Sequence, residues 1–531
     1  MFRKYTQFLD ISMVDETGYM ELLNFNPLIY PGGYGPLYIL SYKIVFQIVP
    51  DFIQLHYFFI ITLTWLPAVA IFYFLRSRKV SFVVALLSSW LLFISTYIAA
   101  FDWWARTAHY SIFACFVFLI FTYRYKQKPI VFLAFAFFFL KILSYVRPEL
   151  NVASYLILLL LLVLVIYKKV KKQELHINIS FLEKSILGIF ALVFLGMFLI
   201  WKSPTQNTGR LYFALGQHYK FNTIRWNNEE RKEFINWEET FKKQFGESKN
   251  LQDMYKANPK ETTKHVLYNV KHYLQQTLDF TTELFLPKSI FKFNFIFKYV
   301  LFVVVFVLLV IKLGTKKYIQ ALKQKIIDEY LFLYFAAVFA LPSLLASFVI
   351  YPREHYYIMQ VVFIIYLIYI LLSPFKDLFQ TQKNINLIYA IIAIVIVFAC
   401  TPHVSKYKRY NNFYTYTKPN YLPYIQTIRN LKIDSITNFL SFEILPVYLG
   451  KNFKGYPYFM KKPFYDSIIV QQNIDMLYVS DAIIDAKQHQ TDSQFHFFMN
   501  NYQNLGWQKI QLKDKNGYLI LKNELLTHDS K

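Results

Sequence analysis

Residues 149–167 read ELNVASYLILLLLLVLVIY, a stretch whose only charged residue is its first, Glu149. A helix needs about 20 predominantly apolar residues to cross a hydrocarbon core ~30 Å thick, so this stretch predicts a membrane span. Comparable runs recur near residues 55–75, 80–100, 109–123, 129–146, 184–201, 295–312, 330–350, 356–372 and 386–404. Because 56% of the 531 residues are hydrophobic and only 17% are charged, we expect a polytopic α-helical membrane protein. The runs predict about ten transmembrane helices.

Short basic clusters follow every second apolar run. They are residues 76–79, 124–128, 168–172 and 312–325. Lys and Arg concentrate on the cytoplasmic side of membrane proteins, so we expect these connections to be cytoplasmic loops. The alternate connections then face outward: residues 1–54, 101–108, 147–148, 202–294, 351–355 and the tail from 405. This placement accounts for the net charge of +24, and no basic face or binding motif indicates a nucleic-acid partner.

The pattern predicts a domain organisation that alternates membrane and outer regions. The regions are a first outer loop with an interfacial helix (1–54), transmembrane helices 1–6 (55–201), a large outer loop (202–294), transmembrane helices 7–10 (295–404) and a small outer α/β domain (405–531). In the large loop, Pro259 opens a helical pattern that continues to Leu278. In the last region, Asn516-Gly517 between residues 507–512 and 518–521 predicts a hairpin. Residues 435–440 and 476–479 are further expected strands.

The two cysteines, Cys115 and Cys400, both lie inside apolar runs. They provide neither a disulfide framework nor a cluster of thiolate metal ligands.

Ionisable residues collect on the side predicted to face outward. They are Asp15, Glu16, Asp102, Arg106, His109, Arg147, Glu149, Arg353, Glu354 and His355. Single charges at helix ends are often anchors that reach the headgroup level, but several connections that bring such groups to one side favour a polar site. There a carboxylate such as Asp15 can act as a general base for an acceptor hydroxyl. Arg147 and Arg353 can bind a phosphate, because a guanidinium matches phosphate in a bidentate manner.

Four short segments resemble the GT-C superfamily of integral-membrane glycosyltransferases, which includes protein O-mannosyltransferases and the bacterial aminoarabinose transferase of lipid A. The segments are Asp15-Glu16-Thr17, Gly35-Pro36-Leu37-Tyr38, Tyr145-Val146-Arg147-Pro148-Glu149 and Tyr351-Pro352-Arg353-Glu354-His355-Tyr356. Their order and common sidedness carry the resemblance, which covers roughly residues 13–404.

The resemblance implies transfer of a sugar from a polyprenyl-phosphate donor, with inversion at the anomeric carbon, to a lipid, glycan or protein acceptor. We expect a bacterial plasma (inner) membrane protein of cell-envelope polysaccharide chemistry, with its active site and C-terminal domain on the outer, periplasmic side. By this analogy Asp15 is the base, and Glu16 is its alternative or a metal ligand. Several members use a divalent metal cation, so Mg, Mn or Zn held by Asp15 and Glu16 is an expected cofactor.

The remaining site residues are assigned by the same analogy. The donor phosphate is expected at Arg106, Arg147, Arg353 and His355, and the donor or acceptor pocket at Tyr34, Asp102, His109, Glu149 and Tyr356.

The sequence departs from the family at its start. The family has a span before the acidic pair, whereas only a short polar segment precedes Asp15 here. We therefore expect a first helix to be missing from this sequence.

Three other functions fit parts of the pattern. A transporter or flippase of lipid-linked glycans would need inverted repeats and charges near mid-span, and Lys141 is the main charge within an apolar run. A polysaccharide ligase of another membrane family would share the lipid-linked substrate. A scaffold would only present the C-terminal domain to a partner.

Overall fold

The computed structural model describes residues 35–95, 106–172, 180–202, 208–230, 236–285, 295–375, 421–431, 435–441, 446–450, 452–457, 463–480, 487–512 and 517–529, with residues 234, 391, 392, 394, 395, 397, 433 and 484 between them. Asp15, Glu16, Tyr34 and Asp102 lie outside these ranges. The described residues form two compact units, one of residues 35–40 and 60–397 and one of residues 41–59 and 421–529.

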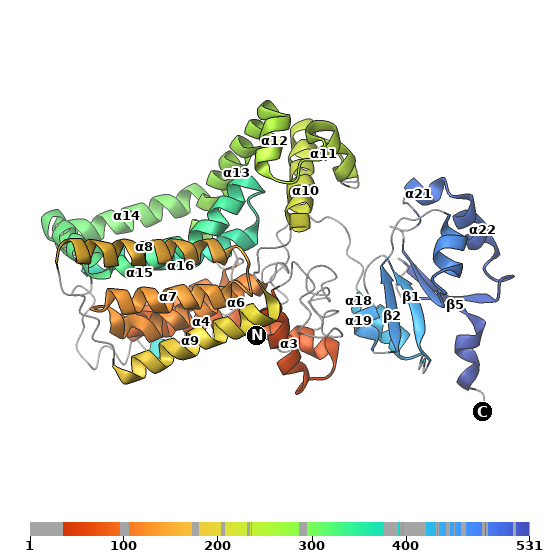
Figure 1. Cartoon of the computed structure of the whole chain (residues 1–531), viewed down its shortest axis with the longest axis horizontal. Coiled ribbons are helices and arrows are strands. Elements are labelled where there is room, and N and C mark those ends of the chain that lie inside the picture. The colour runs from red at the N-terminus through yellow and green to blue at the C-terminus, as the bar shows by residue number, and fades with distance from the viewer. Residues whose placement is uncertain are drawn as a thin grey trace. The chain divides into compact units, whose positions relative to one another are not determined.

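The first unit is helical. Its apolar helices are α4 (Phe52–Ser77, whose first residues belong to the second unit), α5 (Phe82–Ile94), α6 (Arg106–Thr122), α7 (Pro129–Leu143), α8 (Leu150–Val170), α9 (Phe181–Trp201), α14 (Phe295–Leu313), α15 (Thr315–Val349) and α16 (Glu354–Leu372). Successive helices run back and forth, and α7 packs against α8 and α9 while α16 packs against α6 and α15 (Figure 1).

Six of the described helices are long and apolar enough to cross a membrane. They are Phe52–Ser77, Thr107–Tyr125, Leu150–Val170, Phe181–Trp201, Thr315–Val349 and Tyr356–Phe375. The chain is therefore mostly helical with several candidate spans, as its sequence predicts. The number of about ten spans stays a prediction, because α5 and α7 are shorter apolar helices and most of 386–404 lies outside the described residues.

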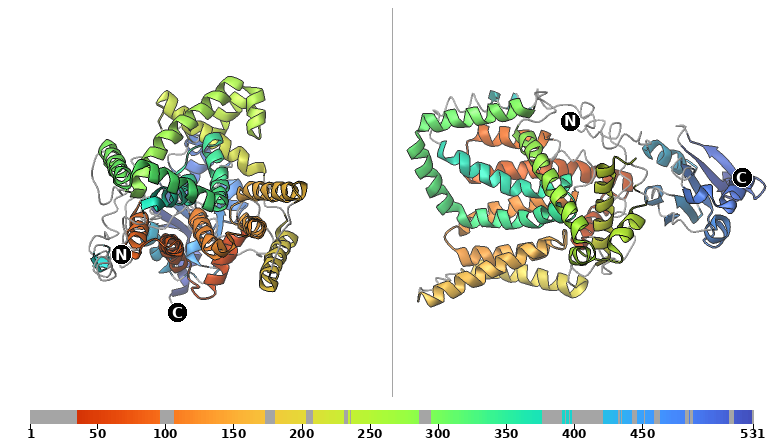
Figure 2. Two further views of the ribbon diagram at one scale, coloured as in Figure 1. Left: turned by 90° about the vertical axis from the view of Figure 1, so that its left-hand side faces the viewer. Right: turned by 90° about the horizontal axis from the view of Figure 1, so that it is seen from above.

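Helix α9 combines a capped N-terminus with an exposed apolar face. Ser180 caps the helix: its side chain accepts a hydrogen bond from Glu183 N, and Glu183 Oε2 accepts one from Ser180 N at 2.9 Å. Further along, Leu192 and Leu199 are 68% and 71% exposed. An apolar face of this length left open at the edge of the unit (Figure 2) suits contact with lipid rather than water.

The basic residues 312–325 are not a loop, which corrects the prediction. Only Gly314, at φ 86°, separates α14 from α15, and α15 then continues for 35 residues. Residues 315–330 contain neither glycine nor proline and many good helix formers. At about 1.5 Å per residue such a helix exceeds the thickness of a hydrocarbon core, so its first turns extend the apolar part as a basic helix.

Polar helices lie within the region predicted as a large outer loop, residues 202–294. They are α10 (Thr208–Asn227), α11 (Trp237–Phe245), α12 (Leu251–Ala257) and α13 (Pro259–Phe285), and they gather at one end of the first unit (Figure 1). The predicted helix from Pro259 is confirmed as α13. Asn258 caps it, with Oδ1 accepting a hydrogen bond from Glu261 N at 3.1 Å.

The second unit contains α3 residues from 41 on and the C-terminal α/β fold. Helix α3 (Pro36–Phe46) lies in the region, residues 1–54, where the sequence predicts a helix. The sheet has the order β2-β1-β3-β5-β4. Its elements are α18 (Tyr421–Arg429), β1 (Thr437–Ser441), α19 (Pro446–Leu449), β2 (Phe453–Pro457), η7 (Tyr465–Val470), β3 (Met476–Ser480), α21 (Lys487–Gln490), α22 (Ser493–Asn501), β4 (Trp507–Gln511), β5 (Gly517–Lys522) and η8 (Asn523–Asp529).

The sheet confirms the predicted strands. Strands β4 and β5 pair antiparallel from Trp507–Lys522 to Gln511–Tyr518, which confirms the hairpin. The two-residue turn expected at Asn516-Gly517 is wrong, because Gly517 is already the first residue of β5 and the connection is longer. Alternate side chains of β3 and β5 pack against η7 and α22 in a core that includes Leu477, Phe498 and Ile520.

Asp475 links three strands of this sheet. Its Oδ2 accepts a hydrogen bond from Asn438 N at 2.9 Å, and its Oδ1 lies 2.7 Å from Lys522 Nζ. Asn438 belongs to β1, Lys522 ends β5, and Asp475 itself directly precedes β3.

Asp475→Ala is expected to destabilise the sheet by about 1–3 kcal/mol, because a strand N–H and an ammonium both lose their acceptor. Amide hydrogen exchange in β1, β3 and β5 of the full-length protein measures this as faster exchange. Glu524→Ala is the matched control, since that carboxylate is 3.9 Å from Lys522 and 74% exposed. Equal exchange in both variants would contradict the assigned role.

Candidate functional site at one end of the helices

Contacts within the first unit distinguish the two opposite ends of its helices. At one end, Arg78 Nη2 donates to Leu119 O at 3.4 Å, and Lys126 Nζ lies 3.7 Å from Glu329 Oε1. These residues belong to the basic clusters or to the helix turns beside them. At the other end, Arg147 Nη1 donates to Thr107 Oγ1 at 3.4 Å. The motif that contains Arg147 therefore lies opposite the basic clusters, as the charge pattern predicts.

Two predicted motifs touch at this second end. Leu37 N donates to Tyr145 O at 3.1 Å. A Cβ added to Gly35 would lie 2.2 Å from Val146 O, so only glycine lets the two backbones come this close. The start of α3 is thus seated directly on the turn that carries Arg147.

Arg147 is buried in an ion pair. Its side chain is 9% exposed, Nε donates to Glu149 Oε1 at 2.6 Å, and Nη2 contacts the same oxygen. The turn forms because α7 ends at Leu143 and Pro148 cannot continue its hydrogen bonding; Arg147 N still reaches Leu143 O at 3.0 Å. Through Thr107 and Glu149, Arg147 connects the starts of α6 and α8. Its two charge-assisted bonds to Glu149 fix the orientation of the guanidinium.

Two further polar residues lie beside this turn on α7 and α8. Lys141 Nζ donates to Asn151 Oδ1 at 2.6 Å and lies 3.7 Å from the ring centroid of Tyr155. Lys141 stands out in the sequence as a charge in an apolar run. Its partners could have been found from their spacing, since Asn151 and Tyr155 are the polar residues four apart at the start of an apolar helix.

The polar helices supply a second cluster around Tyr351. The ring of His218 stacks on Tyr351 at 5.3 Å, and the Arg225 guanidinium lies 5.2 Å from the Tyr351 centroid. Arg225 Nη1 donates to His272 Nε2 at 3.0 Å. The Tyr351-Pro352-Arg353 motif is therefore held by α10 and α13.

A buried network explains why these helices sit there. His265 Nε2 donates to Val349 O at 3.2 Å, and Asn269 Nδ2 donates to Phe348 O at 3.0 Å. Asn222 Nδ2 donates to His265 Nδ1 at 2.9 Å. These bonds satisfy carbonyls at the end of α15 that have no partner within the helix. The network was not predicted, although His265, Asn269, His272 and Gln276 recur at helical spacing on α13.

Burial lowers the pKa of His265 to about 4, more than its backbone hydrogen bonds raise it. Burial and, next, the charge of Arg225 lower the pKa of His272 to about 4. Both rings are therefore neutral at pH 7.

The predicted site residues are placed as follows. Arg147 and Glu149 are brought together. Arg353 is half-buried directly before α16, Tyr356 lies half-buried in its first turn, and His109 is buried in α6. Arg106 and His355 lie in the first turns of α6 and α16. Among the described hydrogen bonds and ion pairs, Arg353 and Arg147 share no partner.

The predicted metal ligands, Asp15 and Glu16, lie outside the described residues. Within the described ranges, no group of three or more His, Cys, Asp or Glu side chains could hold a metal ion.

The fold and this cluster define a mostly helical protein with six helices long and apolar enough to span a membrane among its described residues, and with a polar cluster at one set of helix ends. No protein-family model, curated protein or solved structure matches the chain.

Gly35→Ala is expected to destabilise the protein by about 1–3 kcal/mol, because the added methyl group meets backbone rather than a movable side chain. Thermal unfolding of the purified protein measures the change. Gly188→Ala is the control: nothing lies within 4 Å of its Cβ position in α9, so this variant should be as stable as the parent or slightly more so. Equal stability of the two variants would contradict the contact between Gly35 and Val146.

The polar helices should loosen in acid. Because the pKa of His265 falls from 6.5 to about 4 on folding, its neutral form stabilises the fold fully above about pH 6.5. This contribution is lost as the pH falls toward 4, by about 2 kcal/mol at pH 5. Hydrogen exchange of α13 amides, corrected for intrinsic rates, measures the loss. His265→Gln should flatten the pH dependence, whereas the exposed-histidine variant His496→Gln should retain it. An unchanged pH dependence in His265→Gln would contradict the assignment.

Proposed function

We propose that this protein is a membrane glycosyltransferase that moves a sugar from a polyprenyl-phosphate donor to an acceptor on the outer face of the membrane. One observation carries the proposal. Segments at residues 35–37, 107 and 145–149, far apart in the sequence, meet around a buried arginine at the helix ends opposite the basic clusters. Two of these segments, 35–37 and 145–149, belong to the four segments that carry the resemblance.

The reaction would proceed by one displacement. The acceptor oxygen attacks the anomeric carbon from the face opposite the phosphate, the bond between that carbon and the phosphate oxygen breaks, and the lipid phosphate leaves with the bonding electrons. The acceptor proton passes to a carboxylate base, which we assign to Asp15. Cationic groups would stabilise the charge that grows on the departing phosphate.

Arg147 supports this proposal by its setting. Glu149 Oε1 contacts Nε and Nη2, and Thr107 Oγ1 accepts from Nη1. A planar guanidinium has five N–H donors, so two remain outside these contacts. A fixed arginine can present its other donors to phosphate with little loss of side-chain freedom. The pairing with Glu149 also compensates the buried charge when no donor is bound.

The helices that face lipid support the choice of donor. Residues such as Leu199 of α9 and Leu159 of α8 are 71% and 58% exposed. A polyprenyl chain could remain in the bilayer beside such surfaces while its phosphate reaches the helix ends.

The test uses the full-length protein in lipid nanodiscs with a panel of radiolabelled polyprenyl-phosphate sugars. Release of polyprenyl phosphate is followed in the presence of candidate lipid, glycan and peptide acceptors. Arg147→Lys keeps the charge but loses the fork of donors, so turnover is expected to fall by about 10–100-fold. Asp15→Asn should lower it by at least about 100-fold.

Arg124→Lys is the matched control, since Arg124 is exposed at the opposite helix ends and the variant should keep full turnover. Donor binding without release from any donor would contradict the enzyme and favour a transporter or flippase of lipid-linked glycans. Absence of donor binding would favour a scaffold.

A further inference from the structure

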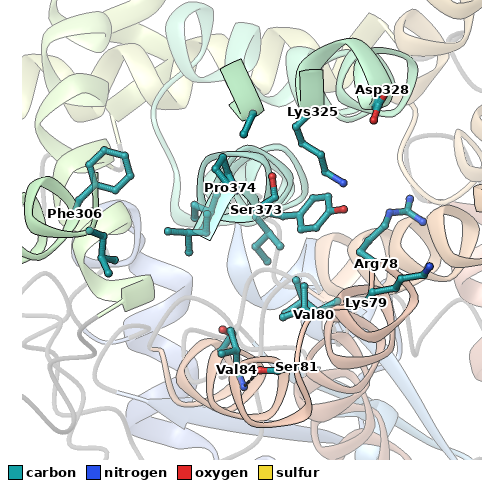
Figure 3. Close-up of a pocket in the computed structure, with 18 of the residues that line it drawn as sticks. Arg78, Lys79, Val80, Ser81, Val84, Phe306, Lys325, Asp328, Ser373 and Pro374 are labelled. Atoms are coloured by element: carbon teal, nitrogen blue, oxygen red, sulfur yellow. Dashed lines mark hydrogen bonds between the residues drawn. The ribbon is translucent and has the colours of Figure 1, made fainter. Parts of the chain in front are cut away.

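A cavity of about 850 Å³ lies at the helix ends opposite the candidate site. It is lined by residues from the end of α4, from α5, α14 and α16, and from the basic first half of α15. In Figure 3, Arg78, Lys79 and Lys325 lie on one side of this cavity and Phe306 lies on the other.

Arg78, in the cavity wall, is a buried arginine with few hydrogen-bond acceptors. Its side chain is buried at 6% exposure, and its guanidinium lies 3.5 Å from the ring centroid of Tyr123. Within the described part of the chain, its one hydrogen bond is the long contact from Nη2 to Leu119 O. Among the described residues, Nε and Nη1 have no acceptor. A buried cation with so few acceptors is costly unless an anion compensates it.

The nearby buried carboxylate does not supply that anion. Glu329 is fully buried, accepts a hydrogen bond from Tyr366 Oη, and lies 3.4 Å from Lys325 Nζ and 3.7 Å from Lys126 Nζ. Of the described carboxylates, none lies within ion-pair distance of Arg78. Asp328, the other acidic residue at the cavity, is 44% exposed on its side chain and pairs with Lys126 at 4.0 Å.

The cavity therefore keeps an excess of positive charge at its polar side. Arg78, Lys79 and Lys325 line it together with a single acidic side chain, Asp328.

The rest of the wall is apolar and extends away from these charges. It includes Val84, Leu91, Val305, Phe306, Leu309 and Ile368. A ligand that fits both parts has a compact anionic head and a hydrocarbon tail. The cavity, at about 850 Å³, has a volume that suits such a ligand. Basic pockets between membrane helices on the cytoplasmic side bind anionic headgroups.

We infer that this cavity binds a lipid phosphate, with the phosphate group near Arg78, Lys79 and Lys325 and the hydrocarbon chain along α5, α14 and α16. Two lipids share this chemistry: an anionic glycerophospholipid of the adjacent leaflet and a polyprenyl phosphate. The inference does not depend on glycosyl transfer, because it concerns the opposite helix ends and is read out by binding.

The test measures lipid retention by native mass spectrometry of the purified full-length protein. The protein is exchanged into detergent with phosphatidylglycerol, polyprenyl phosphate or phosphatidylcholine at equal concentration. We expect the two lipids with net negative charge to be retained about tenfold more than zwitterionic phosphatidylcholine, which corresponds to about 1.4 kcal/mol. The anionic lipid that is retained better identifies the source of the phosphate.

Two variants locate the binding. The double variant Lys79→Gln with Lys325→Gln removes cations while Arg78 stays packed, and Ser88→Trp fills the cavity from α5. Both should reduce anionic lipid retention to the level of phosphatidylcholine. Lys171→Gln and Ser185→Trp are the matched controls, because neither residue lines the cavity, and both should retain the lipid as the parent does.

Equal retention of all three lipids by the parent would overturn the inference, and Arg78 would then be a packing residue held by aromatic rings. Unchanged retention in both test variants, with parental elution on gel filtration, would overturn it as well.

Discussion

The ion pair between buried Arg147 and half-buried Glu149 depends on a constraint that governs the whole helical unit. Inside a bilayer every backbone polar group must find a partner within its own helix, so irregular backbone and charged groups are confined to helix ends. The turn at residues 144–148 is such an end. There one arginine contacts the starts of α6 and α8, while the α3 start reaches the same turn through Leu37 and Gly35.

The same constraint gives the two sets of helix ends different chemistry. One set carries motif residues and is covered by polar helices whose side chains, such as His265 and Asn269, take up the carbonyls at the end of α15. The other set carries the basic clusters, and there Arg78 turns inward to a cavity while most lysines remain exposed. A transferase that uses a lipid-linked donor needs polar chemistry at one membrane face and lipid-compatible surfaces along its length. This architecture provides both.

The apolar runs were predictable because lipid imposes a length on them, and α4, α8 and α9 follow the runs at 55–75, 149–167 and 184–201. The strands β3, β4 and β5 were predictable from alternation, whereas the position of the turn was not, because Gly517 belongs to β5. The extension of α15 was not, because a cluster of lysines fits a loop and a basic helix equally well. The partner of Arg147 depends on the geometry of the turn after α7, which no spacing rule supplies. The inward direction of Arg78 was equally hidden, since the charge pattern assigns a side of the membrane and not the direction of one side chain.

The central claim is that the helix ends around Arg147 face outward and the basic ends face the cytoplasm. Single-cysteine labelling tests it most directly, with Lys202→Cys and Lys171→Cys each introduced after replacement of Cys115 and Cys400. Lys202 is exposed and directly follows Trp201 at the end of α9. Its carbonyl accepts a hydrogen bond from Tyr145 Oη at 2.8 Å, so Lys202 marks the Arg147 end. Lys171 marks the opposite end. A membrane-impermeant maleimide applied to intact cells is expected to label the cysteine at 202, and to label the one at 171 only after permeabilisation. Labelling of 171 but not 202 in intact cells would contradict the account.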